Sequence, residues 1–341
     1  MSYVRVLQQK PIHRLSLGAS LFLTACLTFY VFVVYRDYSV PLNTDTGVVV
    51  LDSRLLYPDY GIWNWSQSST ASFNTTATDL VFYNKVGKCG SRSLVYLLRR
   101  LGRINNFTSA GQSKTPNSKS RYLTPTDQLE LVQRITSLPR PATFYRHTVF
   151  IDFLRFGAQR PIYINIIRRP LDRLVSEYYF KRFGDDKNSS KGFLGETKYQ
   201  SFDDCVLLNK SECRGDNIFY IIPYFCGQQQ QCRSATEWAL QTAKVNVINH
   251  FLVVGLSEEY ENTLRVLEKM LPQFFTTAVR AFKTPGVIPS TKTRKKQPPK
   301  PEVVKIMTER LKLEIEFYEF IKDRFQRLKR QLQIDVHDNY L

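Results

Sequence analysis

The segment Leu80–Leu101 constrains the fold most, because it predicts a strand, a turn and a helix in immediate succession. Residues 80–83 form an apolar run of strand length, and the turn after them contains two glycines. Beyond the turn, leucines recur at i, i+3, i+4 and i+7, the spacing of a helix face: Leu94, Leu97, Leu98 and Leu101. Free N–H groups and the positive end of the helix dipole converge at such a turn, so we expect a phosphate-like anion there. The side chains available to it are Lys88, Ser91, Arg92 and Ser93.

A turn of this kind is weak evidence alone, since every α/β protein has several and most bind nothing. It also departs from the Walker A pattern, in which a Ser or Thr follows Gly-Lys and holds Mg²⁺. Cys89 occupies that position here. The departure disfavours a lumenal kinase or a nucleoside triphosphatase, and favours a ligand whose chemistry needs no metal at this loop.

A second strand–turn–helix unit is predicted over residues 161–183. Ile162–Ile167 is a near-continuous apolar run, as expected for a strand buried on both faces of a parallel sheet. Arg168 and Arg169 follow at its carboxyl end, where open α/β sheets bind ligands, so they should face the same crevice as Lys88. The alternative reading of the two arginines is ordinary surface charge.

Other patterns complete an α/β fold with a central parallel sheet flanked by helices. Phe251–Leu256 reads as a third strand, followed by Ser257 as helix N-cap and a helix to about Met270. A helix is expected over 125–138 with Leu129, Val132 and Ile135 on one face, and a surface loop over 110–120. Residues 283–300 are basic and proline-rich, typical of a solvated linker or of a loop that folds over an anion, and 302–332 reads as one long charged helix.

The N-terminal residues predict a membrane anchor. Residues 15–35 carry no charge, and about 20 apolar residues span a bilayer. Basic residues precede the run, which places residues 1–14 in the cytoplasm. A cleaved signal peptide is the rival, but its apolar region is normally shorter. We therefore expect a transmembrane signal anchor, a stem over 36–78 and a lumenal domain over 79–341.

Glycosylation sequons and cysteines agree with a lumenal compartment. Two short-range disulfides are expected, Cys205 with Cys213 and Cys226 with Cys232, the alternative being free buried thiols. No histidine lies near these four cysteines, which disfavours zinc. The Asn-x-Ser/Thr sequons begin at Asn64, Asn74, Asn106, Asn188 and Asn209.

The formal net charge of +18 suits a polyanionic partner. Nucleic acid, anionic lipid and an acidic polysaccharide are all compatible with that charge. A lumenal location makes nucleic acid a poor candidate. A non-catalytic lumenal protein that binds polyanions through its basic surface remains an alternative of a different class.

Several motifs together resemble the Golgi 2-O-sulfotransferases of glycosaminoglycans, most closely the uronyl 2-O-sulfotransferase branch. The similarity runs from about Val81 to the last helix and is carried by these segments: Tyr-Asn-Lys-Val-Gly-Lys-Cys-Gly-Ser-Arg (83–92), Pro-Ile-Tyr-Ile-Asn-Ile-Ile-Arg-Arg-Pro (161–170), Phe-Gly-Asp (183–185), Tyr-Ile-Ile-Pro-Tyr-Phe-Cys-Gly (220–227) and Glu-Phe-Tyr-Glu-Phe (316–320). The resemblance implies a P-loop-like sulfotransferase fold and a type II Golgi membrane protein. It also implies transfer of sulfate to the 2-hydroxyl of a uronic acid, and relatives form trimers.

The resemblance implies 3′-phosphoadenosine 5′-phosphosulfate as donor. Carried over by position, Arg168 and Ser176 match the pair for the 3′-phosphate, and Thr293 and Lys296 match a late loop that closes over the nucleotide. The loop around the 5′-phosphosulfate comprises Lys88, Cys89, Gly90, Ser91, Arg92 and Ser93.

His147 lies in a segment that resembles the one carrying the family's catalytic base. A histidine with an ordinary pKa near 6.5 suits removal of a proton from a sugar hydroxyl, although a lone histidine is usually structural. Heparan-acting relatives have a second histidine where this chain has Tyr145, and Pro-Lys-Thr where it has Gly87-Lys88-Cys89. These departures favour a chondroitin or dermatan acceptor over heparan; pipe-like relatives leave other acceptors open.

We expect positive side chains, and no metal, to stabilise the leaving group and to bind the polymer. Lys88 is expected to stabilise charge on the leaving phosphate oxygen. Three further cations, each of which could instead be surface charge, are predicted to grip the carboxylates and sulfates of the polymer: Lys85, Arg146 and Arg182.

Overall fold

A computed structural model describes residues 49–51, 71–73, 79–111, 120–186, 195–290 and 292–334. The chain divides into two compact units, residues 1–46 and 47–341, and all of the described residues belong to the second. The predicted cytoplasmic tail and anchor lie outside the described residues, as do most of the stem and the sequons at Asn64, Asn74 and Asn188. Among the described ranges, no helix is both long and apolar enough to cross a membrane.

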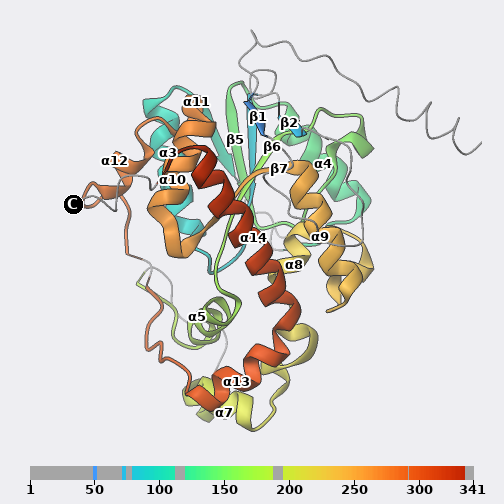
Figure 1. The fold of residues 1–341 in the computed structure, drawn as a ribbon, viewed down its shortest axis with the longest axis vertical. Helices are drawn as coiled ribbons and strands as arrows, with labels where there is room; N and C mark the ends of the chain where they lie inside the picture. Colours follow the sequence, from blue (N-terminus) through green and yellow to red (C-terminus); the bar gives the residue numbers. More distant parts are fainter. Residues whose placement is uncertain are drawn as a thin grey trace, which may run out of the picture. The chain divides into compact units, whose positions relative to one another are not determined.

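A five-stranded parallel sheet forms the centre of the second unit, in the order β4-β5-β3-β6-β7 (Figure 1). The predicted class, a parallel sheet flanked by helices, is confirmed. The central strand β3 pairs with β5 on one side and β6 on the other, so the strand order reverses around it. The strands are β3 (Leu80–Asn84), β4 (Thr108–Gly111), β5 (Ala142–Arg146), β6 (Ile162–Ile167) and β7 (Phe251–Leu256); β1 (Val49–Leu51) and β2 (Ala71–Phe73) form a separate antiparallel pair.

Helices connect and cover these strands. Every residue of β3, β5, β6 and β7 is buried, as expected for strands covered on both faces. The long α14 packs on β7 and α9, and α5, α7 and α13 share a second apolar cluster (Figure 1). The helices are α3 (Ser91–Ile104), α4 (Pro125–Thr136), α5 (Pro170–Phe183), α6 (Glu196–Tyr199), α7 (Phe202–Leu207), α8 (Ile221–Cys226), α9 (Glu237–His250), α10 (Tyr260–Met270), α11 (Pro272–Phe275), α12 (Ala278–Lys283), α13 (Pro301–Arg310) and α14 (Lys312–Gln331).

Several predicted elements are confirmed and others need correction. The four leucines predicted on the inner face of α3 are buried. Leu129 was expected on the inner face of α4, but Gln128 and Leu131 take that face and Leu129 is exposed. Ser257 begins a 3₁₀ turn, Ser257–Glu259, instead of capping α10 directly. The single helix expected over 302–332 is two helices that meet at Leu311.

Both predicted disulfides are present, Cys205–Cys213 and Cys226–Cys232. The first joins α7 to a 3₁₀ turn at Ser211–Cys213, and the second ties the end of α8 to a 3₁₀ turn at Gln230–Arg233. Because α8 lies next to the carboxyl ends of the central strands, the second bridge also supports the site described below.

Candidate functional site

The turn after β3 forms an anion-binding geometry from backbone groups. Gly90 precedes α3 with a left-handed φ of 76°, and Lys88 also has a positive φ of 65°. No side chain caps the N-terminus of α3, and its first turn contains no acidic residue. The free N–H groups and the helix dipole therefore favour an anion at this end of the helix.

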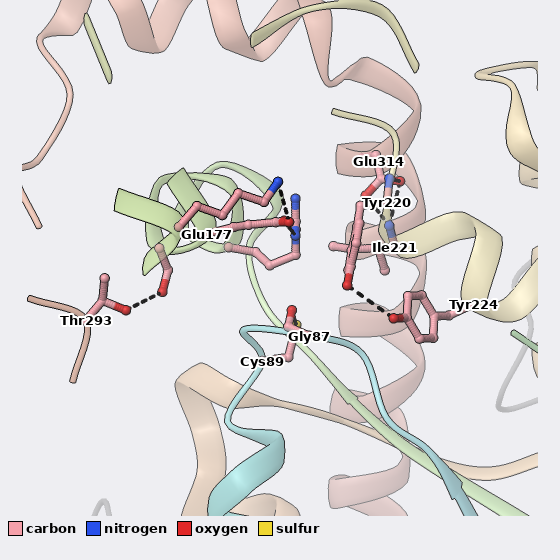
Figure 2. A network of polar contacts seen from close by, with 11 residues as sticks. Gly87, Cys89, Glu177, Tyr220, Ile221, Tyr224, Thr293 and Glu314 are labelled. Atoms are coloured by element: carbon pink, nitrogen blue, oxygen red, sulfur yellow. Dashed lines mark hydrogen bonds and ion pairs between the residues drawn. The ribbon is translucent and has the colours of Figure 1, made fainter. Parts of the chain in front are cut away.

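Lys88 meets residues from two distant segments at this turn. Its Nζ donates to Thr293 Oγ1 at 3.1 Å, and Thr293 Oγ1 lies 3.1 Å from Ser176 Oγ. Figure 2 shows Thr293 in this contact beside α5. The late loop is fixed there because Thr293 pairs with Asp185 in an isolated β-bridge and Arg294 N–H donates to the Gly184 carbonyl at 3.1 Å. The structure thus brings together three residues predicted to contact one nucleotide.

Arg168 and Lys296 lie in the same electrostatic environment. Arg168 follows β6 directly, and its charge contributes to lowering the pKa of both Lys88 and Lys296. Burial is the larger cause in each case, and it lowers the pKa of Lys88 to about 8. Asp185 and Glu177 partly offset this repulsion at Lys88, as Asp172 does at Lys296. The pKa values of both lysines are lowered all the same, so a bound anion would stabilise their charged forms.

Arg92 adds a further cation to the turn. It forms an ion pair with the fully buried Asp185 and lies over the Phe180 ring, which also supports Lys88 Nζ at 3.9 Å. Arg92 Nη1 is buried without a hydrogen-bond partner among the described residues. An orphaned buried N–H is costly, and an anion in the turn would satisfy it.

Cys89 and Lys85 differ in what they can contribute. Cys89 is fully buried, its Sγ donates to the Gly87 carbonyl at 3.6 Å, and burial raises its pKa to about 12, so it remains a neutral thiol. Lys85 lies one residue beyond β3, with its Nζ 5.6 Å from the Tyr145 ring centroid. Burial lowers the pKa of Lys85 to about 8.

His147 follows β5 and lies beside Lys85. Its Nδ1 is 2.9 Å from the Lys85 carbonyl oxygen, which can only accept, so Nδ1 carries the proton and Nε2 keeps its lone pair. Burial, followed by the charge of Lys85, lowers the pKa of His147 to about 4. At neutral pH the imidazole is therefore a neutral base with one fixed tautomer.

Arg146 and Arg182 do not join this cluster in the expected way. Arg146 is largely buried at the end of β5, with its Nη2 3.5 Å from the Ser120 carbonyl oxygen. Arg182 is fully buried, stacks 3.5 Å from the Tyr178 ring centroid and pairs with Glu212 at 2.5 Å. A guanidinium enclosed in this way supports the fold and does not reach an external polymer, so the substrate role predicted for Arg182 does not fit the structure.

Sequence reasoning missed a group that supports the turn from the side of α8. The Tyr220 hydroxyl lies 3.1 Å from that of Tyr224, and Arg173 stacks on the Tyr220 ring at 4.1 Å while pairing with Glu177 (Figure 2). Glu314 accepts from three N–H groups at the start of α8, those of Tyr220, Ile221 and Ile222. Only the motif at 220–227 marked this region in the sequence.

Comparison with known proteins identifies the family. Residues 71–321 match the model of the Sulfotransferase family. The chain belongs to the sulfotransferase family. It is 42% identical to human Uronyl 2-sulfotransferase over 266 residues, which cover 75% of this chain and 65% of that protein. It is 36% identical to Heparan sulfate 2-O-sulfotransferase 1 of Gallus gallus over 253 residues, 72% of this chain and 70% of that protein. The match thus spans just under two thirds of the human relative.

Membership of the sulfotransferase family implies a 3′-phosphoadenosine 5′-phosphosulfate donor, and the residues present fit it. The uncapped start of α3 and the unpartnered Arg92 Nη1 suit the phosphosulfate. Arg168 and Ser176, on the β6 side of the same turn, suit a second phosphate. The donor has two anionic ends, and this sulfotransferase offers a cationic group for each.

Gly87 should tolerate a side chain only if the Tyr220 hydroxyl is removed. A Cβ added at Gly87 would lie 2.8 Å from that hydroxyl oxygen but 3.6 Å from the next ring atom. Gly87→Ala should therefore weaken donor binding about tenfold by displacing the turn, and Gly87→Ala with Tyr220→Phe should recover most of it. Calorimetry with adenosine 3′,5′-bisphosphate measures both, with Tyr220→Phe alone as control. Equal binding by Gly87→Ala and the parent protein would refute this packing constraint.

Proposed function

We propose that this chain transfers sulfate from 3′-phosphoadenosine 5′-phosphosulfate to the 2-hydroxyl of iduronate or glucuronate residues in dermatan or chondroitin sulfate. The observation that carries the proposal is one edge of the sheet, where the Lys88 ammonium contacts the Thr293 hydroxyl, Thr293 contacts the Ser176 hydroxyl, and His147 presents a neutral imidazole. The relatives named for uronyl 2-sulfation support the acceptor position.

The residues of the chain would divide the reaction between them. The bound donor supplies an activated sulfuryl group, so little covalent work falls to the protein beyond alignment and charge stabilisation. His147 Nε2 accepts the proton of the attacking sugar hydroxyl while Nδ1 stays bonded to the Lys85 carbonyl. Lys88 Nζ exchanges its contact with Thr293 for the phosphate oxygen that gains charge as the S–O bond breaks.

The remaining assignments belong to the same proposal. Lys85 and the exposed cations of the basic chain would attract the polymer, and Arg146, the last residue of β5, would add to the same positive charge. Residues 15–35 would anchor the protein in the Golgi membrane with residues 79–341 in the lumen, as a homotrimer. Asn106 and Asn209 are exposed, as a glycosylation site requires.

An acceptor panel tests the proposed function. The lumenal part of the chain, expressed as a secreted protein, is incubated with labelled donor and with dermatan, chondroitin and N-sulfated heparan polymers. We expect 2-O-sulfated uronate in disaccharides from dermatan or chondroitin. Label on heparan alone would favour the heparan-acting branch. Binding of polymer without any binding of adenosine 3′,5′-bisphosphate would favour a non-catalytic polyanion-binding protein.

The protonation state of His147 gives a test that needs no turnover. Because burial lowers its pKa to about 4, the neutral form should be fully present from pH 7 to about 5 and be lost only as the pH falls through 4. Nitrogen-detected NMR of the imidazoles should show a protonated Nδ1 and an unprotonated Nε2 over that range. The His147→Asn variant assigns the signal, and a midpoint near the ordinary 6.5 would contradict the buried, polarised geometry.

A further inference from the structure

Arg121, four residues before α4, packs against three tyrosine rings next to the candidate site. Its guanidinium carbon lies 4.6 Å from the ring centroid of Tyr220, 5.0 Å from Tyr122 and 5.9 Å from Tyr224. A guanidinium stacked on aromatic rings is held in place while its N–H edge stays available for hydrogen bonds. Packing therefore orients this cation, which also makes a side-chain hydrogen bond with Tyr122.

The backbone of Arg121 is tied to the segment that carries His147. The Arg121 carbonyl accepts from the Thr148 hydroxyl at 3.2 Å and from the Val149 N–H at 3.1 Å. These two donors immediately follow His147 in the sequence. A displacement of the His147 segment would therefore move Arg121 with it.

The Tyr220 ring connects Arg121 to the donor-binding turn. The hydroxyl of Tyr220 closely approaches Gly87, since a Cβ there would lie 2.8 Å from it. Figure 2 shows Tyr220 and its partner Tyr224 beside the turn that holds Gly87 and Cys89. Arg121 is thus linked to the donor turn through the Tyr220 ring, and to the segment that follows His147 through its own backbone carbonyl.

The charge of Arg121 is uncompensated by the protein. Arg173, the other cation stacked on Tyr220, pairs with Glu177, whereas no carboxylate in the described part of the chain pairs with Arg121. Arg121 Nη1 is buried and has no hydrogen-bond partner among the described residues. A stacked, unneutralised guanidinium with an orphaned N–H is the arrangement expected where an anionic ligand group completes the site.

We propose that Arg121 binds an anionic group of the acceptor polysaccharide, a carboxylate or a sulfate ester, and so positions the sugar at His147. The inference rests on the proposed function and assigns Arg121 to the acceptor, since the backbone of Arg121 is bonded to the two residues that follow His147. A second, exposed guanidinium, that of Arg233, lies 4.3 Å from the centroid of the Tyr122 ring.

The test compares the parent protein with Arg121→Gln in binding a defined dermatan oligosaccharide. Calorimetry is done with adenosine 3′,5′-bisphosphate present. Because Arg121→Gln loses a charge-assisted hydrogen bond, we expect it to bind the oligosaccharide about tenfold or more weakly than the parent, with its nucleotide affinity unchanged. Arg121→Lys keeps the positive charge but loses the two-pronged guanidinium, so its oligosaccharide affinity should lie between those of the parent and Arg121→Gln. Arg265→Gln, which removes an exposed guanidinium on α10, should match the parent.

Modified oligosaccharides identify the anionic group. If Arg121 binds the carboxylate, the tenfold penalty disappears with a carboxyl-reduced oligosaccharide and persists with a desulfated one; if it binds a sulfate, the pattern reverses. The inference would be overturned if Arg121→Gln bound all three oligosaccharides more weakly by the same factor, if it lost nucleotide binding to the same extent, or if it bound them as the parent does. Oligosaccharide binding that depends on Arg121 without any sulfate transfer would instead remove the proposed function and leave this assignment standing.

Discussion

Replacing His147 with asparagine should lower kcat for sulfate transfer by about 10³-fold, within the range that positioned general bases contribute. Asparagine can keep the hydrogen bond to the Lys85 carbonyl through its amide N–H, but it has no basic nitrogen to replace Nε2. The sugar hydroxyl would then have to lose its proton to water. Transfer from labelled donor measures the loss, and calorimetry with adenosine 3′,5′-bisphosphate should give an affinity within about twofold of the parent.

His250 offers a matched control for this loss. It is also a largely buried histidine with a pKa lowered by burial to about 4, and its ring packs 4.7 Å from that of Phe150. His250→Asn should lower thermal stability while leaving kcat near the parent value. If His147→Asn keeps the parent activity, His147 acts only through its hydrogen bond. If the variant loses nucleotide binding together with activity, His147 supports the fold.

The parts of the fold that were predictable share one physical property. β3, β6 and β7 are buried on both faces, so each reads as an apolar run that stands out from its surroundings. β5 was not predicted, because Ala142–Arg146 includes a threonine and ends in a charged residue that only tertiary packing buries. β4, with intermediate exposure throughout, was not predicted either, and its last two residues were assigned to the loop expected over 110–120.

The residues of the candidate site likewise include some that local sequence rules predict and others that they do not. Lys88 and Arg168 were placed together by a general rule about the carboxyl ends of parallel strands. Thr293 lies 205 residues from Lys88, and only the family resemblance predicted that it would reach the turn. The enclosure of Arg182 by Glu212 and the stacking of Arg121 on Tyr220 could not be predicted, because sequence reports charge but not whether a carboxylate or an aromatic ring will surround it.

Replacing Lys88 with alanine should lower kcat by about 10²-fold or more, with a smaller rise in the KM of the donor, because a preorganised cation matters most where charge develops in the transition state. The substitution tests the side chain alone, since Lys88 already has a left-handed φ of 65° that alanine would share. Lys322→Ala, which removes an exposed lysine paired with Glu319 on α14, is the matched control and should keep the parent rate.

The division of the Lys88→Ala defect between kcat and KM decides between two roles. The Lys88 ammonium is held by Thr293 and rests on the Phe180 ring, so it is available to the leaving oxygen without the ordering of a mobile side chain. A defect confined to the donor KM would assign Lys88 to ground-state binding alone. An unchanged rate would remove it from the reaction, and the charge on the leaving phosphate would then have to be met by Arg92 and the N-terminus of α3.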